Sequence, residues 1–434
     1  MSQANVDDRS RLRAVLDSLI LHLHPARVPA AAIRFTYTWG LGGISTVLVI
    51  ILVLTGVLLM FRYEPTVDRA YSSIQALEAE VTFGSLFRAI HRCSATLLII
   101  TTFLHLVRVF LSGGFKQGRF VNWLIGIALL VLVLFFNFTG YLLPWDQLAY
   151  WAMTVSTTMI GYIPLIGKTV SRFVLAGPEV GQGTLSNFYA LHVALLPFLL
   201  AVVLGYHFWR VRKDGGISQP VRKDGQRVQR LTTIPHLVRK EIAVAALVTT
   251  VVVLWGMLVP APLGELANPN QPPSPAKAAW YFVGLQELLL HMDPRAFIIL
   301  AGIVMVGMVL LPRWDRQDEN IGIYFRSPVG RRVALVSACL SLYLVPLLVV
   351  ADEYWINLPA MLPQWPVIIS NGLLPVLFIL AGLAAIYYGA RWGLKANHSE
   401  ALVGLFTCVM VGLLVLTIIG NFFRGPGMAL VLPF

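Results

Sequence analysis

The chain has 434 residues, of which 57% are hydrophobic and 12% are charged, and its formal net charge is +12. Soluble domains carry about 25% charged residues, so this composition excludes a soluble globular protein. The basic residues do not form a separate domain, which argues against a nucleic-acid-binding protein. The three cysteines have no short spacing, which excludes a disulfide framework, an iron–sulfur cluster and a C-x-x-C-H haem motif on this chain.

Apolar segments of membrane-spanning length follow one another along the sequence. About 20 apolar residues cross the roughly 30 Å hydrocarbon core, and nine segments qualify: 40–62, 87–111, 121–143, 187–209, 241–260, 295–312, 331–351, 366–390 and 401–423. Loops on the side of the N-terminus hold about 23 of the 33 Lys and Arg residues, which predicts a cytoplasmic N-terminus. The sequence therefore predicts an all-α integral membrane protein, and its polar first 35 residues indicate an interfacial segment rather than a signal peptide.

The spans divide into blocks separated by polar or long loops. Residues 36–230 are predicted to form a four-helix bundle, and residues 231–360 to form a second unit after a polar loop. In that loop Val-Arg-Lys-Asp-Gly occurs at 211–215 and again at 221–225. Residues 361–434 hold two additional spans, interpreted as packing or partner-docking helices. Two long loops, 144–186 and 260–279, are predicted on the same outer face, and long ordered loops are often functional.

Four histidines lie within two of the predicted spans, His91 and His105 on one and His192 and His207 on the other. Separations of 14 and 15 residues return both rings of a pair to about the same helix face, roughly 21 Å apart. Two such helices side by side present one imidazole each at two depths, as two bis-histidine haems require. The alternative is four ordinary buried histidines, although ionisable residues within spans usually mark sites.

Paired glycines repeat the histidine spacing on two neighbouring spans. Gly42 and Gly56 lie 14 residues apart on the first span, and Gly126 and Gly140 lie 14 apart on the third. A haem edge can approach a helix backbone closely only where there is no Cβ. These glycines therefore predict two flat slots in a four-helix di-haem bundle, although small residues also serve ordinary helix packing in membranes.

Four arginines lie near the ends of the histidine-bearing spans. Arg88 precedes His91 by three residues on the outer side, and Arg108, Arg119 and Arg212 lie toward the cytoplasmic side. We expect them to bind the haem propionates, which need cationic partners near the membrane faces. The alternatives are snorkelling side chains and the positive-inside bias.

Several short motifs extend over roughly residues 30–360. They are His91-Arg92 with Ser94-Ala95, Ser112-Gly113-Gly114-Phe115-Lys116, Gly140-Tyr141-Leu142-Leu143-Pro144-Trp145-Asp146-Gln147, Val180-Gly181-Gln182, Gly264-Glu265, Ala267-Asn268-Pro269 and Trp280-Tyr281-Phe282. In these motifs the chain resembles cytochrome b of the quinol-oxidising bc and b6f complexes. The likeness is greatest to the b6 branch, because the second histidine pair is 15 rather than 14 residues apart, and residues 231–360 resemble its subunit IV.

The resemblance implies two b-type haems, an outer one bound by His91 and His192 and a cytoplasmic-side one bound by His105 and His207. It implies that a quinol such as menaquinol is oxidised at an outer site around Trp145 and the Trp280–Tyr281 motif. One electron would pass to a high-potential partner, such as a Rieske-type iron–sulfur protein, and the other through the haems to a quinone site near the cytoplasm. It further implies coupled proton translocation, a cytochrome c-type companion and a homodimeric complex in a prokaryotic inner membrane.

The outer quinol site departs from its family at one carboxylate. The family signature there is Pro-Glu-Trp-Tyr, whereas this chain has Ala278-Ala279-Trp280-Tyr281. Quinol oxidation still needs a proton acceptor, and Glu287 follows Trp280 by seven residues, about two helical turns. We therefore expect Glu287 on the same helix face, with a pKa raised by burial. The alternative is a helix-end carboxylate paired with Arg295.

A second departure concerns covalent haem. The b6 branch attaches a further haem through a cysteine directly before Leu-Gly-Gly on the first span. The corresponding residue here is Gly40, before Leu41-Gly42-Gly43, so we expect no covalent c-type haem on this chain.

Two other functions would fit part of the pattern. A di-haem membrane anchor of another quinone-linked dehydrogenase or reductase would share the histidines, but such anchors usually have four or five spans. A proton-coupled transporter with histidine relays would show inverted repeats and broken helices, and the sequence shows neither.

Overall fold

The structure is a computed structural model of the chain. It describes residues 10, 14–15, 17–18, 20–116, 118–219, 228–316 and 322–431. The second copy of the Val-Arg-Lys-Asp-Gly repeat, residues 221–225, lies outside the described residues.

Nine helices among the described residues are long and apolar enough to cross a membrane. They are α3 (Leu41–Met60), α5 (Gly84–Leu111), α6 (Phe120–Leu142), α9 to α10 (Gln182–Lys213), α11 (Thr233–Leu258), α13 (Pro294–Trp314), α14 (Pro328–Tyr354), η2 to α16 (Ile369–Gly393) and α17 (His398–Phe422). The prediction of an all-α integral membrane protein is confirmed, and each predicted span corresponds to one of these helices.

Short elements lie before, between and after the spans. They are α2 (Phe35–Thr38), α4 (Ala70–Glu80), α7 (Gln147–Gly161), α8 (Gly167–Leu175), α12 (Val283–Leu290), α15 (Leu358–Met361) and η3 (Pro426–Met428). Strands β1 (Arg27–Pro29) and β2 (Arg230–Thr232) pair antiparallel, with Arg27 opposite Thr232. This pairing ties the N-terminal segment to the loop that precedes α11.

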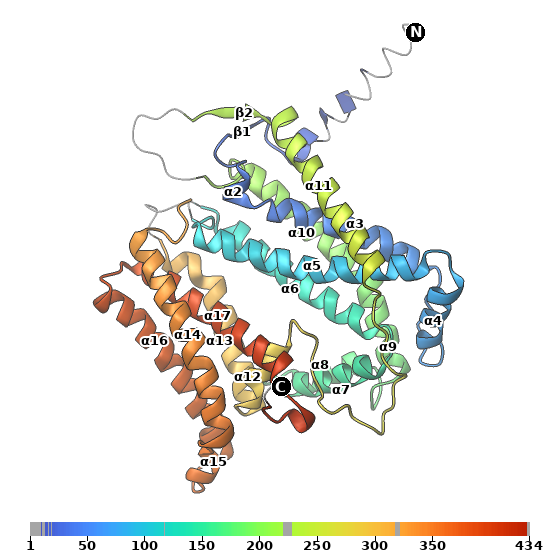
Figure 1. Cartoon of the computed structure of the whole chain (residues 1–434), viewed down its shortest axis with the longest axis vertical. Coiled ribbons are helices and arrows are strands. Elements are labelled where there is room, and N and C mark those ends of the chain that lie inside the picture. The colour runs from blue at the N-terminus through green and yellow to red at the C-terminus, as the bar shows by residue number, and fades with distance from the viewer. Residues whose placement is uncertain are drawn as a thin grey trace.

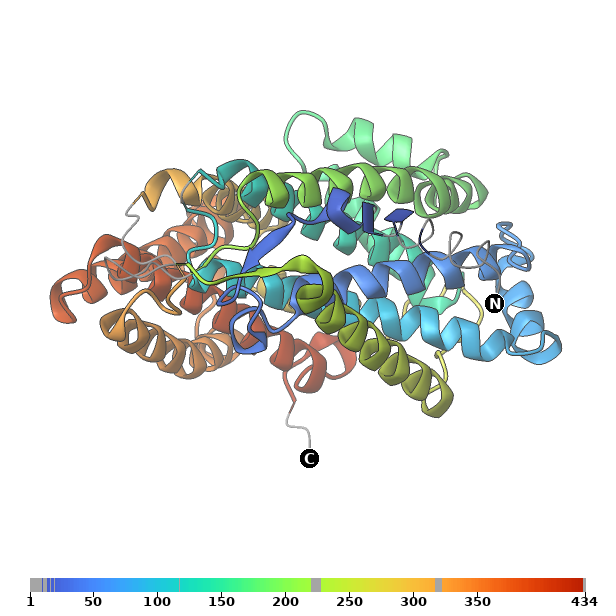
Figure 2. The same ribbon diagram turned by 90° about the horizontal axis from the view of Figure 1, so that it is seen from above.

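Helices α3, α5, α6, α10 and α11 gather in one part of the molecule, and α13, α14, α16 and α17 in another (Figures 1 and 2). In the first part α5 packs against α3, α6 and α11, and α10 packs against α6. Gly256 on α11 allows close packing, because a Cβ there would lie 2.9 Å from Ile90 Cγ1. The helix after the polar loop thus packs directly on the histidine-bearing α5.

The last helix, α17, packs against α12, α14 and α16. Gly404 lets α17 approach α14 closely, because a Cβ there would lie 2.6 Å from Val333 Cγ1, as small residues do between membrane helices. Phe406 of α17 stacks on Phe110 of α5, with ring centroids 3.8 Å apart. Helix α17 therefore contacts both the second part of the molecule and α5 of the first part.

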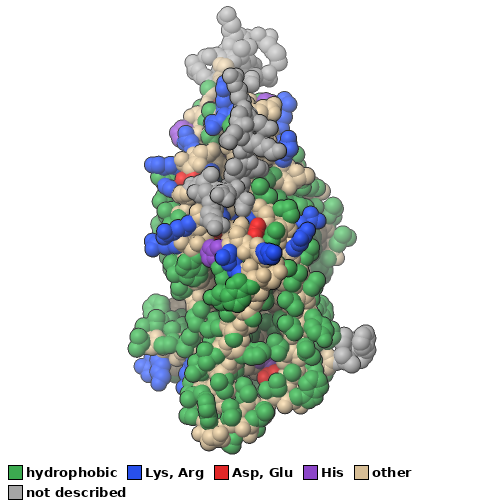
Figure 3. Space-filling model, turned by 90° about the vertical axis from the view of Figure 1, so that its left-hand side faces the viewer, with side chains coloured by type: hydrophobic (Ala, Val, Ile, Leu, Met, Phe, Trp, Pro, Cys, Tyr) green, Lys and Arg blue, Asp and Glu red, His purple; other side chains and the backbone are tan. Residues whose placement is uncertain are grey.

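Basic side chains gather over the upper half of the face seen in Figure 3, and the lower half is largely hydrophobic. Beneath the surface, at the helix ends near residues 112–119, Asp315 forms a buried ion pair with Lys116 at 2.8 Å. Asp315 also accepts a hydrogen bond from Ser399 and lies 3.5 Å from Arg326. This cluster joins the loop after α5, the end of α13 and the start of α17.

Candidate functional site

His91 of α5 and His192 of the α9–α10 helix face each other in the first part of the molecule. Their ring centroids are 6.3 Å apart and the ring planes are inclined by 68°. Metal–imidazole bonds of about 2 Å from both sides would place the two ring nitrogens about 4 Å apart, and the observed separation of the rings leaves room for this. His192 lies in the π-helical turn η1 (Leu191–Leu195), and such turns frequently occur at functional sites.

Glycines form the walls behind these rings. A Cβ at Gly56 would lie 3.2 Å from His91 Cε1, and one at Gly140 would lie 2.7 Å from His192 Cε1. Gly42 lies against His105 in the same way, at 3.5 Å. The space next to Gly126 is open, with no heavy atom within 4 Å of a Cβ built there. Three of the four predicted glycines therefore face a histidine ring, and the fourth faces free space.

Two threonines that the sequence analysis did not identify bind the same pair of histidines. Thr55 Oγ1 lies 2.9 Å from His91 Nδ1, and Thr139 Oγ1 lies 2.9 Å from His192 Nδ1. Each threonine directly precedes the glycine that contacts the same ring. The repeated Thr-Gly pair on two spans was the signal in the sequence that could have revealed them.

The second pair of histidines, His105 and His207, lies one level further along the same helices. His207 Nδ1 is buried and has no hydrogen-bond partner among the described residues. An unpartnered nitrogen, glycine walls and open space beside Gly126 all fit flat ligands that are held by histidine.

Arg88 has other partners in this structure. Its guanidinium forms an ion pair with Glu78 and donates hydrogen bonds to the carbonyls of Ala261 and Pro262. These contacts hold the loop after α11 against α5, and they compete with the predicted binding of a haem propionate by Arg88.

The three arginines at the other level differ in how fully they are bound. Arg119 donates to two backbone carbonyls of the loop after α10, and Arg212 donates to the carbonyl of His22. Arg108 donates through Nε to the carbonyl of Tyr37 and lies over its ring, but its buried Nη2 has no partner among the described residues. Of the three, Arg108 is the best placed to bind an anionic group.

The two predicted long loops meet at the opposite end of the helices from the basic loops. Asp146 caps α7 and also accepts a hydrogen bond from the backbone N–H of Gly264, at 2.9 Å. Gln147 donates from its backbone to Glu265 and accepts from the backbone N–H of Asn268. The motifs around Trp145 and Asn268, more than 100 residues apart, are therefore neighbours.

Tyr281 lies in the turn before α12 and packs against the apolar cluster of α3, α5 and α11 that includes Ile90 and Cys93. Its hydroxyl is buried without a hydrogen-bond partner among the described residues, and burial raises its pKa. Trp280 is 39% exposed, and its ring meets that of Tyr281 edge to face. An unpartnered hydroxyl beside an exposed indole can bind a polar ring.

Glu287 does not share a helix face with Trp280, and this expectation was wrong. Helix α12 begins only at Val283, so Trp280 precedes the helix and the seven-residue spacing does not apply. Glu287 is 0% exposed and faces α17, where Gly420 leaves space for it. Arg295 pairs with Asp293 instead.

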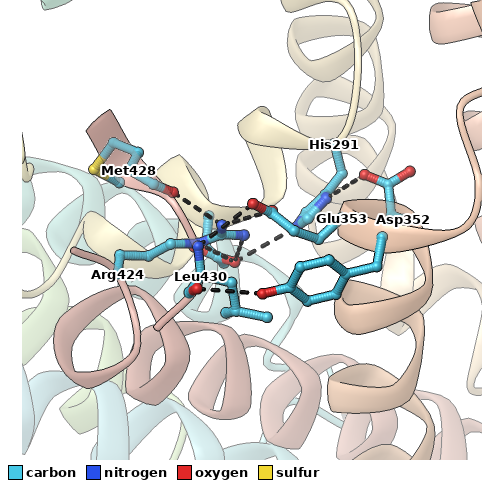
Figure 4. A network of polar contacts seen from close by, with 8 residues as sticks. His291, Asp352, Glu353, Arg424, Met428 and Leu430 are labelled. Atoms are coloured by element: carbon cyan, nitrogen blue, oxygen red, sulfur yellow. Dashed lines mark hydrogen bonds and ion pairs between the residues drawn. The ribbon is translucent and has the colours of Figure 1, made fainter. Parts of the chain in front are cut away.

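The partner of Glu287 is Arg424, which follows α17. Arg424 Nη2 lies 2.7 Å from Glu287 Oε1, and its Nε donates to both carboxylate oxygens at 3.1 and 3.0 Å. Arg424 also binds Glu353 at 2.7 Å. His291 links Glu287, at 3.4 Å, to Asp352, at 2.7 Å. Figure 4 shows Arg424, Glu353, His291 and Asp352 in this network.

The expectation of a raised pKa for Glu287 was also wrong. Burial alone would raise the pKa, but hydrogen bonds and charge from His291 and Arg424 outweigh it, so the pKa lies below its usual value. The pKa of His291 is raised to about 9, because its bonds to Asp352 and Glu287 outweigh the effect of burial. Glu287 is therefore an ionised, weakly basic carboxylate, and its role as a proton acceptor stays a prediction.

Comparisons with known proteins identify the family. The sequence model of the family Cytochrome b/b6/petB matches residues 28–215. Cytochrome b6 of Acaryochloris marina and cytochrome b6 of Porphyra purpurea are each 40% identical to this chain over 215 residues, 50% of the chain and 96% of the relative. The chain belongs to the cytochrome b/b6 family.

A solved structure shares the fold over nearly the whole chain. A chain described as "Hyperthermophilic respiratory Complex III" superposes with a TM-score of 0.67 at 22% identity, and the match covers 96% of this chain and 98% of that one. Family membership makes this chain an integral-membrane electron-transport protein and an oxidoreductase subunit of the bc or b6f type. The cofactors of the family are b-type haems, with quinone as substrate.

Proposed function

We propose that this chain oxidises quinol near the outer ends of its helices and passes electrons across the membrane to a quinone site near the cytoplasmic ends. His91 with His192 would hold one b haem, and His105 with His207 would hold a second. The facing pair His91–His192, with 6.3 Å between ring centroids and a glycine behind each ring, is the observation that carries the proposal.

The outer quinol site in this proposal lies around Tyr281, Trp280 and Trp145. The buried Tyr281 hydroxyl has no partner among the described residues, so a quinol oxygen can form its missing hydrogen bond. The contacts of Asp146 and Gln147 with residues 264–268 hold the loop before this turn in place. Oxidation of quinol releases two protons and two electrons there, and the bound haems supply one-electron carriers between the two faces.

The proposal extends to the organisation of the complex. One electron per quinol goes to a high-potential partner, a Rieske-type iron–sulfur protein, with a cytochrome c-type subunit further along and a homodimer as the assembly. The N-terminus lies in the cytoplasm of a prokaryote, so protons released outside make the reaction electrogenic. Residues 36–230 form the di-haem unit and residues 231–360 the quinol-site unit, with no covalent haem at Gly40.

Haem stoichiometry tests the proposal directly. The pyridine haemochrome spectrum of the purified complex should show two b haems per chain. His192→Leu should remove one haem and abolish electron transfer from quinol. His22→Leu is the matched control, because within the described part of the chain the His22 ring bonds only to the nearby Ser18 carbonyl, and it should retain both haems. Two haems in His192→Leu, or none in the wild type, would contradict the proposal.

A further inference from the structure

Thr55 and Thr139 bind the two facing histidines in the same way from opposite sides. Thr55 is on α3 and Thr139 is on α6, and each hydroxyl oxygen lies 2.9 Å from Nδ1 of its histidine. Both threonines are buried, with 6% and 0% exposure. The same arrangement built independently on two helices indicates a role tied to the pair of rings.

The direction of these hydrogen bonds follows from the second bond of each threonine. A hydroxyl has a single hydrogen to donate. Thr55 donates it to the carbonyl of Ile51, at 2.7 Å, and Thr139 donates it to the carbonyl of Phe136, at 3.1 Å. Each hydroxyl oxygen is then left to accept, so Nδ1 of each histidine must carry the proton.

This assignment fixes the tautomer of both rings. A neutral imidazole protonated on Nδ1 keeps its lone pair on Nε2, the nitrogen that remains free to bind a metal. A ring N–H that donates a hydrogen bond also makes its imidazole a more basic ligand, and such outer partners affect metal binding strongly. The threonines therefore prepare His91 and His192 as ligands before any group is bound.

The rings of His105 and His207 differ from the first pair in this respect. Neither the His105 ring nor the His207 ring forms a hydrogen bond within the described part of the chain, and His207 Nδ1 is buried without a partner. Leu41 and Ile125 stand before Gly42 and Gly126, where the outer level has threonine. The two levels thus differ in one defined chemical feature.

We propose that Thr55 and Thr139 are positioning residues that lower the reduction potential of the group bound by His91 and His192 relative to the group bound at the other level. This inference rests on the proposed function, in which the four histidines hold two haems. A more basic ligand stabilises the oxidised iron. The haem held by His91 and His192, nearer the proposed quinol site, would then have the lower potential of the two.

Redox titration of the two haems in the purified complex tests this. Thr55→Val and Thr139→Val keep the branched shape of the side chain but remove the hydroxyl. Each variant should raise the reduction potential of the haem held by His91 and His192 by about 28 mV. For a one-electron couple, this corresponds to about a threefold change in the ratio of reduced to oxidised haem at a given potential. The second haem should keep its potential. Thr55→Ser and Thr139→Ser keep the hydroxyl, so both variants should have the wild-type reduction potential.

Thr46→Val is the matched control, because Thr46 is also on α3 and donates to the carbonyl four residues earlier, at 2.9 Å, but forms no hydrogen bond with a histidine among the described residues. This variant should change the reduction potential of neither haem. Unchanged potentials in both valine variants with full haem content would overturn the inference while leaving the proposed function intact. An equal shift in Thr46→Val would overturn it too. A failure of the proposed function itself would be detected separately, because the His192→Leu protein would then keep two haems.

Discussion

The ion pair between Arg424 and Glu287 allows a quantitative test of how the C-terminal segment is attached. The side chains are 1% and 0% exposed, and the guanidinium contacts the carboxylate at 2.7 to 3.1 Å. Arg424→Met removes the cation and keeps an apolar side chain of similar length. Glu287 is then left as a buried carboxylate whose remaining cationic partner is His291, at 3.4 Å.

The expected cost follows from this environment. Removing one member of a buried ion pair typically lowers the free energy of unfolding by about 3–5 kcal/mol, because the other charge stays buried. His291 compensates part of the charge of Glu287, and Glu353 is partly exposed to water, so we expect about 3 kcal/mol, the lower end of that range. The pair Arg69–Glu64, whose side chains are 65% and 51% exposed, is the control, and Arg69→Met should lower the free energy of unfolding by less than about 1 kcal/mol.

The assay is reversible unfolding of the protein in mixed micelles, followed by circular dichroism. Adding Glu287→Gln to Arg424→Met removes the unpaired charge, so the double variant should regain at least half of the lost free energy of unfolding. A loss below about 1 kcal/mol for Arg424→Met, or no recovery in the double variant, would refute the reasoning, because contacting residues should not be additive.

The pH dependence of the same variants gives an independent check. In the wild type the folded pKa of Glu287 is lowered, so its contribution to stability is present above the unfolded pKa and is lost as pH falls through the folded pKa. In Arg424→Met burial should raise that pKa. Stability should then be greatest below the unfolded pKa of about 4.3 and decrease as pH rises through the folded value. Parallel pH profiles for the two proteins would contradict this assignment.

Three further predictions address single residues. The pKa of His291 in the folded protein is about 9. Its contribution to stability should therefore be complete below about pH 6.5 and be lost as the pH rises through 9. Comparing the unfolding of wild type and His291→Gln at pH 6 and pH 9.5 tests this. Tyr281→Phe should raise the quinol KM about threefold to tenfold with an unchanged haem spectrum, because one hydrogen bond is lost. Gly140→Ala should displace the His192 ring, 2.7 Å from the new Cβ, and reduce haem content, whereas Gly302→Ala, in open space, should not.

The membrane helices could be predicted because a span is a local property of the sequence. The third predicted span, 121–143, corresponds to α6 (Phe120–Leu142) within one residue at each end. The fourth predicted span began at residue 187, five residues after the start of α9 at Gln182. The first residues of α9 include polar side chains and precede the apolar stretch of the same helix. Hydrophobicity marks the part of a helix in the membrane, and it does not report a polar extension of the same helix.

The common face of His91 and His105 could be anticipated because a regular helix repeats its faces, and the pairing of His91 with His192 followed from the family resemblance. Glu287 could not be understood in this way, since its partner Arg424 is 137 residues further along the chain. The helical spacing from Trp280 also failed, because no local signal marked the start of α12 at Val283. Periodicity predicts contacts between regular elements and carries no information on which distant side chain neutralises a buried charge.

Helix α17 connects both ends of the second part of the molecule. At one end Ser399 bridges Lys116 and Asp315, and just beyond the other end Arg424 neutralises Glu287 of α12. The turn that carries Tyr281 directly precedes α12, so movement of α12 would displace the buried Tyr281 hydroxyl. Separating Glu287 from Arg424 would leave a buried charge without its main cationic partner, which is unfavourable. The ion pair therefore restrains the position of α12. Within the proposed function, α17 and Arg424 would therefore act on the quinol site by holding α12 through packing and charge.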